Sequence, residues 1–127
     1  MKMDLAKQIC PTTTMGKIEN GALIVDVRKA TEVANVTFDV SNYMNIPIDE
    51  LEERIHEIPK DKEIVMVCLS GERSLKTTYF LMNNGFQNVF NMDGGIVKWA
   101  SKNFPTKGNV ASLLNLSSCD CSQSNCC

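Results

Sequence analysis

Cys68 is the residue of this chain best placed to do chemistry. It follows an apolar run over residues 64–67 and begins the loop Cys68-Leu69-Ser70-Gly71-Glu72-Arg73-Ser74, which leads into an amphipathic stretch over residues 74–84. This order predicts a strand, a tight loop and a helix, so that the loop's N–H groups and the positive end of the helix meet at the Cys68 sulfur. Such a site favours the thiolate, the reactive form of cysteine.

The loop residues argue against a merely structural Cys68. A buried cysteine is often a small, inert hydrophobe, and an isolated cysteine would be interpreted that way. Here the residues that follow, from Ser70 to Ser74, are polar or conformationally permissive. A loop whose amides converge on an anion needs such residues, and Gly71 is the one expected to adopt a positive φ. The pattern therefore favours a nucleophile.

Composition indicates one globular domain without a basic surface. The chain has 127 residues, of which 43% are hydrophobic and 22% charged, with a net charge of -2. It contains no Lys/Arg block that would indicate nucleic acid binding. The N-terminus is charged where a signal peptide is apolar, and no apolar run approaches the roughly 18 residues of a membrane span. We therefore expect a cytoplasmic protein with neither nucleic acid nor membrane as a partner.

Apolar runs outline an α/β fold. Residues 22–27 and 63–68 are near-continuous apolar runs, the pattern of strands buried on both faces of a parallel sheet. Shorter strands are expected at 44–46 and 88–92. Helical patterns alternate with the strands, over residues 48–58, 74–84 and 94–100. The alternation predicts a central, mostly parallel sheet flanked by helices on both faces, with ligands bound at the carboxyl ends of the strands.

Two further features concern the sheet edge and the chain end. Asp26 and Arg28 close another strand at the same sheet edge as Cys68, and they either form an ion pair that holds loops together or take part in the chemistry. From Lys107 onward the chain is rich in serine and asparagine. We expect a domain over residues 1–106 and a flexible tail over residues 107–127.

Five segments in a fixed order resemble a single-domain rhodanese, a member of the sulfurtransferase family. They are residues 23–28, Asn45-Ile46-Pro47-Ile48, the Cys68–Ser74 loop, Asn91 to Ile96 with Trp99, and Phe104-Pro105-Thr106. The resemblance implies a rhodanese-like fold for residues 1–106. It also implies that Cys68 takes a sulfane sulfur from a donor such as thiosulfate, becomes a persulfide, and passes the sulfur to a thiol, a protein or cyanide.

The resemblance also assigns the site residues, and we expect neither a cofactor nor a metal there. Cys68 is the catalytic residue, and Asp26 and Arg28 lie behind the loop that binds the substrate, formed by Leu69, Ser70, Gly71, Glu72, Arg73 and Ser74. Arg73 either attracts an anionic donor or pairs with Asp26 or Glu72. Ser74 either caps the helix or donates to the bound sulfur.

Activation of Cys68 is expected to come from the main chain. The only histidine, His56, lies on the polar part of a predicted helix, so a Cys-His pair is not expected. The N–H groups of residues 70–74 would instead cradle the outer sulfur of a persulfide. Residues 36–43 read Val-Thr-Phe-Asp-Val-Ser-Asn-Tyr, where family members commonly carry Gly-His-Ile-Pro-Gly-Ala. This departure bears on loop geometry and donor choice rather than on the Cys68 chemistry.

Other functions remain as alternatives. Phosphatases and arsenate reductases on this fold use Cys-x5-Arg, whereas Cys68 and Arg73 form Cys-x4-Arg, and Glu72 would repel a phosphate dianion. A partner-binding, metal-binding or redox-sensing module would use the tail thiols, which either bind Cu(I) or Zn(II), relay or resolve the sulfur of Cys68, or merely oxidise. These thiols are Cys119, Cys121, Cys126 and Cys127. The sequence does not identify the donor or the acceptor, nor does it show whether the transferred atom is sulfur or selenium, or whether the protein is a monomer or a weak dimer.

Overall fold

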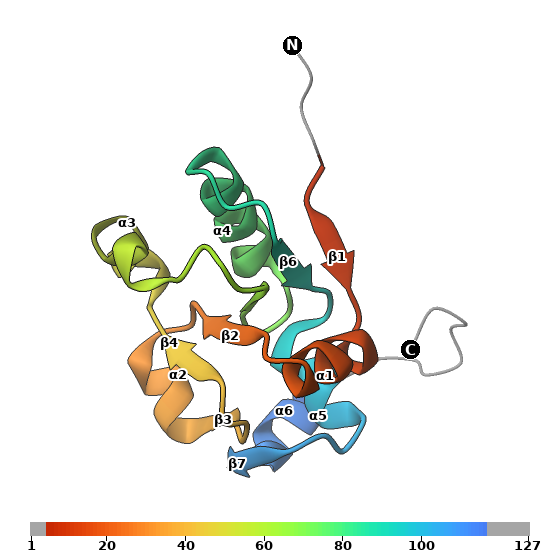
Figure 1. Cartoon of the computed structure of the whole chain (residues 1–127). Helices are drawn as coiled ribbons and strands as arrows, with labels where there is room; N and C mark the ends of the chain where they lie inside the picture. The colour runs from red at the N-terminus through yellow and green to blue at the C-terminus, as the bar shows by residue number, and fades with distance from the viewer. Residues whose placement is uncertain (1–4, 117–127) are drawn as a thin grey trace.

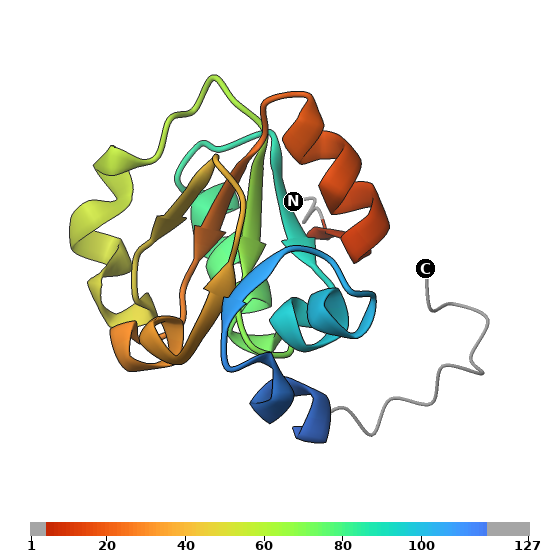
Figure 2. The ribbon, with the colours of Figure 1, turned by 90° about the horizontal axis from the view of Figure 1, so that it is seen from below.

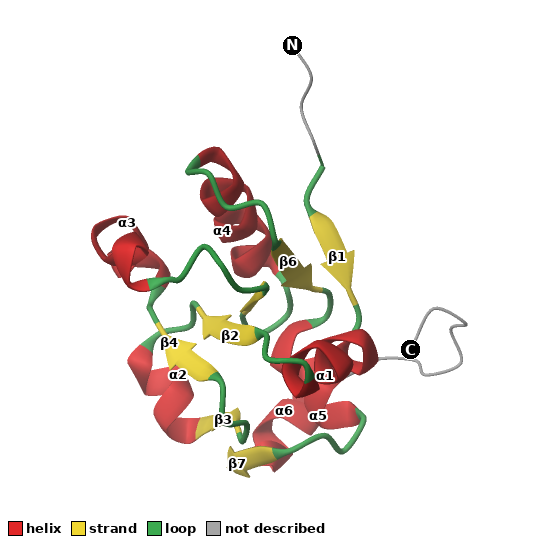
Figure 3. Ribbon diagram, in the orientation of Figure 1, coloured by secondary structure: helices red, strands yellow, loops and turns green. Residues whose placement is uncertain are grey.

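A five-stranded parallel sheet forms the centre of the fold. The structure, a computed structural model, describes residues 5–116. In spatial order the strands are β1 (Lys7–Ile9), β6 (Val89–Met92), β5 (Ile64–Val67), β2 (Leu23–Asp26) and β4 (Tyr43–Asn45), and every neighbouring pair is parallel (Figures 1 and 3). This arrangement confirms the predicted α/β fold. Its consequence is that β2 and β5 lie side by side, with their carboxyl ends at one edge of the sheet.

Helices cover both faces of this sheet. On one face lie α3 (Leu51–Arg54) and α4 (Glu72–Asn83), and on the other lie α1 (Pro11–Glu19), α5 (Gly95–Ser101) and α6 (Val110–Leu116) (Figures 1 and 2). α2 (Ala30–Asn35) follows β2 and leads into β3 (Val36–Phe38). β3 pairs antiparallel with β7 (Thr106–Gly108) in a separate small sheet.

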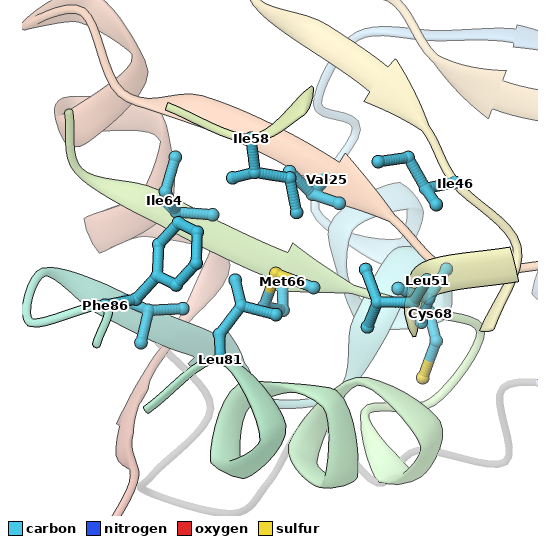
Figure 4. Close-up of a cluster of buried hydrophobic side chains, with 11 residues drawn as sticks. Val25, Ile46, Leu51, Ile58, Ile64, Met66, Cys68, Leu81 and Phe86 are labelled. Carbon is cyan, nitrogen blue, oxygen red and sulfur yellow. The ribbon is translucent and has the colours of Figure 1, made fainter. Parts of the chain in front are cut away.

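The apolar runs fill the interior on both sides of the sheet. All four residues of β5 are buried, and they alternate between a core under α3 and α4 and a core under α1, α5 and α6. Figure 4 shows the first of these cores, with Cys68 at its edge beside Leu51. The burial of β5 on both faces explains why its sequence is continuously apolar rather than alternating.

The segment expected to form one helix over residues 48–58 differs in the structure. It consists of a 3-10 turn at Ile48–Glu50, the short α3, and a second 3-10 turn at Ile55–Glu57. Leu51 and Ile58 are buried and Ile55 packs against the same core, whereas Ile48 is exposed.

α4 contacts the sheet through small polar residues and one leucine. Within the predicted amphipathic helix, the larger residues Leu75, Tyr79 and Met82 are only half-buried. The buried residues are Ser74, Thr77, Thr78 and Leu81. The hydroxyls of both threonines donate to the Ser74 carbonyl at 2.8 Å. Their burial is therefore satisfied within the helix, and the small side chains let α4 approach β5 closely.

The folded part of the chain extends beyond the boundary expected at residue 106. β7 and α6 lie within residues 106–116, and Leu113 is buried in the core that contains Trp99. Trp99 packs edge-on against Phe38 and Phe104, and its Nε1–H donates to the Pro105 carbonyl at 2.9 Å. The ordered domain therefore includes part of the predicted tail. Residues 117–127, with the tail cysteines, lie outside the described residues.

A buried ion pair fixes the carboxyl end of β2. The Arg28 guanidinium donates to the Asp26 carboxylate through Nε at 3.0 Å and Nη2 at 2.7 Å, and both side chains are at most 1% exposed. The Tyr43 hydroxyl donates to the same carboxylate at 2.7 Å, which ties β4 to the pair. Burial and the Asp26 charge raise the pKa of Tyr43, so this hydroxyl keeps its proton. Of the two interpretations of Asp26 and Arg28, the structure shows the ion pair.

Replacing Asp26→Asn should therefore destabilise the domain strongly. The substitution leaves the Arg28 charge buried without its counter-ion, which is expected to lower the free energy of unfolding by about 3 to 5 kcal/mol. Urea unfolding measures this loss. Glu57→Gln, which breaks the exposed pair with Arg54, is the matched control and should leave the midpoint almost unchanged. Equal, small effects of the two substitutions would contradict a buried role for the Asp26–Arg28 pair.

Candidate active site

Cys68 lies at the carboxyl end of β5, at the start of the loop that leads into α4. It is 1% exposed and is a free thiol. Figure 4 shows its sulfur directed toward α4, away from the sheet. The order of strand, loop and helix predicted from the sequence is present in the structure, and the loop of residues 68–71 is short because α4 begins at Glu72.

Two backbone N–H groups donate to the Cys68 sulfur. The Gly71 N–H lies 3.0 Å from Sγ and the Ser74 N–H lies 3.4 Å from it. Gly71 is the N-cap of α4 and has φ of 101°, the left-handed conformation expected for it. The first turn of a twelve-residue helix therefore presents its N–H groups and its positive dipole end to the sulfur.

α5 holds the loop from the other side. The N–H of Ile96 donates to the Cys68 carbonyl at 2.9 Å, and the N–H of Val97 donates to the Leu69 carbonyl at 3.1 Å. Gly95 precedes them with φ of 59°, and a Cβ at this position would overlap both loop carbonyls. The Gly94-Gly95 pair thus allows α5 to dock against the loop, a role that required the three-dimensional structure to find.

Arg73 forms an ion pair with a residue that the sequence analysis did not select. Its two terminal nitrogens donate to the two carboxylate oxygens of Glu32 at 2.8 and 3.0 Å, and so it pairs with neither Asp26 nor Glu72. Glu72 instead accepts from the Ser70 hydroxyl at 3.2 Å. The hydrogen bond from Arg73 lowers the pKa of Glu32 to about 2, against the opposing effect of burial. The pair joins the first turn of α4 to α2.

Ser74 contacts the sulfur with its side chain as well as its backbone. It is the third residue of α4 rather than its N-cap, which is Gly71. Its hydroxyl lies 3.4 Å from the Cys68 sulfur and 2.5 Å from Oδ1 of Asn91. Asn91, in β6, is a second contributor that the sequence analysis missed. Its amide also donates to the Gly71 carbonyl at 3.2 Å, so it touches the loop twice.

A pocket of about 380 Å³ opens beside Leu69. Residues of the loop, of α2 and β3, and of the chain end line it: Arg28, Glu32, Asn35, Val36, Leu69, Ser112 and Leu113. The buried Arg28 and the partly exposed Glu32, whose partners are Asp26 and Arg73, thus border a pocket next to the loop. Asp26 and Arg28 thus support the surroundings of the loop, and neither contacts the sulfur by a hydrogen bond within residues 5–116.

Comparisons with known proteins agree with this geometry. Residues 11–102 match the model of the rhodanese-like domain. The chain belongs to the rhodanese-like family. A sulfurtransferase of Allochromatium vinosum is 36% identical over 83 residues, which cover 65% of this chain and 76% of that protein. A putative sulfurtransferase of Bacillus subtilis is 32% identical over 101 residues, covering 78% of this chain and 95% of that protein.

Solved structures of the family share the fold. The crystal structure of a rhodanese-related protein from Thermoplasma volcanium superimposes with a TM-score of 0.73 and 28% identity, covering 81% of this chain and 99% of that one. Other curated relatives are larger, and the chain spans only 24% of the length of a tRNA uridine(34) hydroxylase of Photorhabdus laumondii, with 35% identity. The rhodanese-like domain is therefore found both alone and as a part of longer proteins.

Two further observations bear on the sequence-based expectations. Within residues 5–116 of this rhodanese-like chain, no cluster of three or more His, Cys, Asp or Glu side chains is arranged to hold a metal ion. Across the same residues, none of the helices has the length and apolar character needed to cross a membrane. The predicted role of the four tail cysteines in metal binding lies outside the described residues.

The Glu32–Arg73 pair predicts a pH-dependent contribution to stability. Because the pKa of Glu32 is lowered from 4.5 to about 2, the pair stabilises the fold above pH 4.5 and loses this effect as the pH falls toward 2. Glu32→Gln should lower the free energy of unfolding by about 1 kcal/mol at pH 7, at the upper end for a partly exposed pair. Urea unfolding should show that the difference from the unsubstituted protein narrows below pH 4.5.

Glu50→Gln is the matched control, since it removes a carboxylate paired with Arg54 on an exposed surface. Its effect should be smaller than that of Glu32→Gln at pH 7. A difference between Glu32→Gln and the unsubstituted protein that stays constant down to pH 2 would show that the Glu32 carboxylate is not the titrating group.

Proposed function

We propose that the chain is a sulfurtransferase that carries a sulfane sulfur on Cys68. The observation that carries this proposal is the pair of backbone N–H groups, from Gly71 and Ser74, that donate to the Cys68 sulfur at the N-terminus of α4. Such donors stabilise a thiolate and need no side-chain base. The rhodanese-like family, which contains the relatives named sulfurtransferase, supports the same function.

The first half-reaction loads the sulfur. The Cys68 thiolate attacks the outer sulfur of a donor such as thiosulfate, a new S–S bond forms at Sγ, and the S–S bond of the donor breaks to release sulfite. The negative charge that was on Sγ moves to the outer sulfur of the persulfide. The N–H groups and the positive dipole end at the start of α4 favour an anion beside Sγ.

The second half-reaction unloads the sulfur. A thiolate of a small molecule or of a protein attacks the outer sulfur, the S–S bond to Cys68 breaks, and the Cys68 thiolate leaves with the electron pair. Cyanide as the acceptor gives thiocyanate by the same displacement. A thiolate stabilised by backbone N–H groups is a good leaving group, so the arrangement that loads the sulfur also helps to release it.

The loop suits sulfur better than phosphate or arsenate. Both terminal nitrogens of Arg73 donate to Glu32, so the guanidinium has its bidentate face occupied by a carboxylate. The Glu72 carboxylate lies in the same first turn. A dianionic oxyanion would therefore approach a loop in which Arg73 is already paired with a carboxylate and Glu72 carries a further negative charge. This charge balance supports sulfur transfer over a phosphatase or arsenate reductase activity.

The proposed setting is the cytoplasm, where thiols stay reduced. The free thiol of Cys68 requires a reducing pool to keep it unpaired, and the same pool supplies thiol acceptors. The proposed partners are thus a small sulfur donor and a thiol-bearing small molecule or protein, with no cofactor. The proposed organisation is a rhodanese-like domain, monomeric or weakly dimeric, followed by a cysteine-rich tail.

The test is the intact mass of the protein before and after incubation with thiosulfate. We expect a gain of one sulfur atom, its loss on addition of cyanide or a thiol, and no gain in Cys68→Ser. Cys10→Ser and a chain ending at Ser118, which lacks the four tail thiols, are the matched controls and should load like the full chain. The reason is that the donors to the sulfur, Gly71 and Ser74, are present in both controls.

Two outcomes would contradict the proposal. Sulfur that still appears in Cys68→Ser but is lost on truncation would place the reactive thiol in the tail. No sulfur on any variant, with either thiosulfate or a low-molecular-weight persulfide as donor, would favour a binding module that uses the fold to dock a partner.

A further inference from the structure

A buried chain of hydrogen bonds leads from Cys68 across two strands to β1. The Ser74 hydroxyl contacts the Cys68 sulfur at 3.4 Å and Oδ1 of Asn91 at 2.5 Å. The Asn91 amide nitrogen donates to Oε1 of Gln8 at 3.1 Å and to the Gly71 carbonyl at 3.2 Å. Cys68, Ser74 and Asn91 are at most 1% exposed. Water is therefore excluded from the contacts among these three residues, whereas Gln8, at the other end, is exposed.

The Ser74 hydroxyl has one proton and two acceptors within reach. A serine hydroxyl donates a single hydrogen bond at a time. Oδ1 of Asn91, at 2.5 Å, is much the closer of the two, and the sulfur at 3.4 Å is the other. While the proton is directed to Asn91, the hydroxyl gives the sulfur no hydrogen bond. When it turns to the sulfur, the Asn91 contact is lost.

The orientation of the Asn91 amide is fixed by its other partners. Both hydrogens of the amide nitrogen have acceptors, one on the neighbouring strand β1 and one in the Cys68 loop. A flip of the amide would place its oxygen against two carbonyl oxygens, which is unfavourable. Oδ1 is therefore held toward Ser74 as a permanent, competing acceptor.

We propose that Asn91 is a positioning residue that sets how strongly the empty Cys68 thiolate is stabilised, by competing with the sulfur for the proton of the Ser74 hydroxyl. This role rests on the proposed function and adds a regulatory element to it. In the empty enzyme the thiolate draws the hydroxyl proton toward Sγ. In the persulfide, Sγ carries two bonds and no charge, so the hydroxyl returns to Asn91.

The competition favours the loaded state. Asn91 keeps the hydrogen bond from Ser74 when Cys68 carries sulfur, whereas the empty thiolate has to take this hydrogen bond away from it. The empty thiolate is consequently less stabilised and more nucleophilic toward a sulfur donor than it would be with Ser74 alone. The loop N–H groups and the positive end of α4 favour negative charge at this place in both states, whichever sulfur carries it.

Charged groups around the sulfur are common to every variant compared below. They are Arg73 and Glu72 in the first turn of α4, Glu32 in α2, the Asp26–Arg28 pair at the end of β2, and Asp93 after β6. The charge of Cys68 contributes to the raised pKa of Arg73, behind the larger effect of the Glu32 hydrogen bond. Since none of these groups is substituted, differences among the variants report on Ser74 and Asn91.

The test is the pH dependence of Cys68 alkylation by iodoacetamide, which needs no sulfur transfer. Asn91→Leu removes the competing acceptor. The pH at which alkylation reaches half its maximal rate, the alkylation midpoint, should therefore fall by about one pH unit, a tenfold change in proton concentration. Ser74→Ala should raise the midpoint. In the double variant the Asn91 substitution should have no further effect, because the hydroxyl through which it acts is gone. Glu57→Gln, in the exposed pair with Arg54 and outside this hydrogen-bond network, is the control.

A purely structural role for Asn91 predicts the opposite sign. If Asn91 only braces the loop through the Gly71 carbonyl, then Asn91→Leu misaligns the Gly71 N–H and raises the midpoint, with or without Ser74. That result would overturn the inference. If Asn91→Leu does not fold by circular dichroism, Asn91→Ala removes the same polar groups without added bulk, and the same two signs decide between the roles.

The half-reactions supply an independent readout. A one-unit fall in the midpoint should slow loading from thiosulfate by about threefold, given the dependence of thiolate nucleophilicity on basicity, and should speed release to an acceptor thiol. Loss of sulfur loading in all variants together with the expected alkylation shifts would remove the proposed function and leave the Asn91–Ser74 coupling intact. Equal slowing of loading and release by Asn91→Leu would contradict the inference.

Discussion

The geometry of the active-site loop depends on one interaction, the hydrogen bonds that backbone N–H groups donate to the buried Cys68 sulfur. His56, the only histidine of the chain, lies exposed in the second 3-10 turn, outside the Cys68 loop. The sulfur is instead met by main-chain donors from Gly71 and Ser74. Main-chain donors cannot change rotamer, so their aim is as rigid as the junction of β5 and α4. The stability of the fold and the reactivity of the site are therefore set by the same contacts.

Three segments distant in sequence hold that junction in place. α2 contributes the Glu32 carboxylate to Arg73, α5 contributes two N–H groups to the loop carbonyls, and β6 contributes the Asn91 amide to the Gly71 carbonyl. Each ties a group of the loop or of the first turn of α4 to another part of the fold. The parallel sheet makes this possible, because it gathers the carboxyl ends of its strands at one edge. A short loop with few contacts of its own thus becomes one of the best-supported parts of the chain.

Part of the fold and of the Cys68 site could be predicted from patterns among residues that are neighbours in the sequence. The strand, the loop, the helix and the positive φ of Gly71 follow from residues adjacent in the chain, and the parallel sheet follows from apolar runs such as β5. The alternatives weighed for Arg73 were an anionic donor and a pair with Asp26 or Glu72, and they did not include Glu32, which lies 41 residues away and is brought close only by the placement of α2. Asn91 was missed for the same reason. α6 was assigned to the tail because a polar sequence with three leucines gives a weak helical signal, and its burial depends on a core formed by other elements.

The loop itself has little means of choosing a sulfur donor or acceptor. Backbone N–H groups recognise negative charge on sulfur whatever its source, and the loop side chains Arg73 and Ser70 are engaged with Glu32 and Glu72. Selectivity must then come from the surfaces next to the loop. The pocket beside Leu69 is bordered by Val36, in the segment that departs from the usual family pattern, and by Ser112 and Leu113 of α6. The segment that departs from the usual family pattern and the folded part of the predicted tail therefore meet at one place, next to the Cys68 loop.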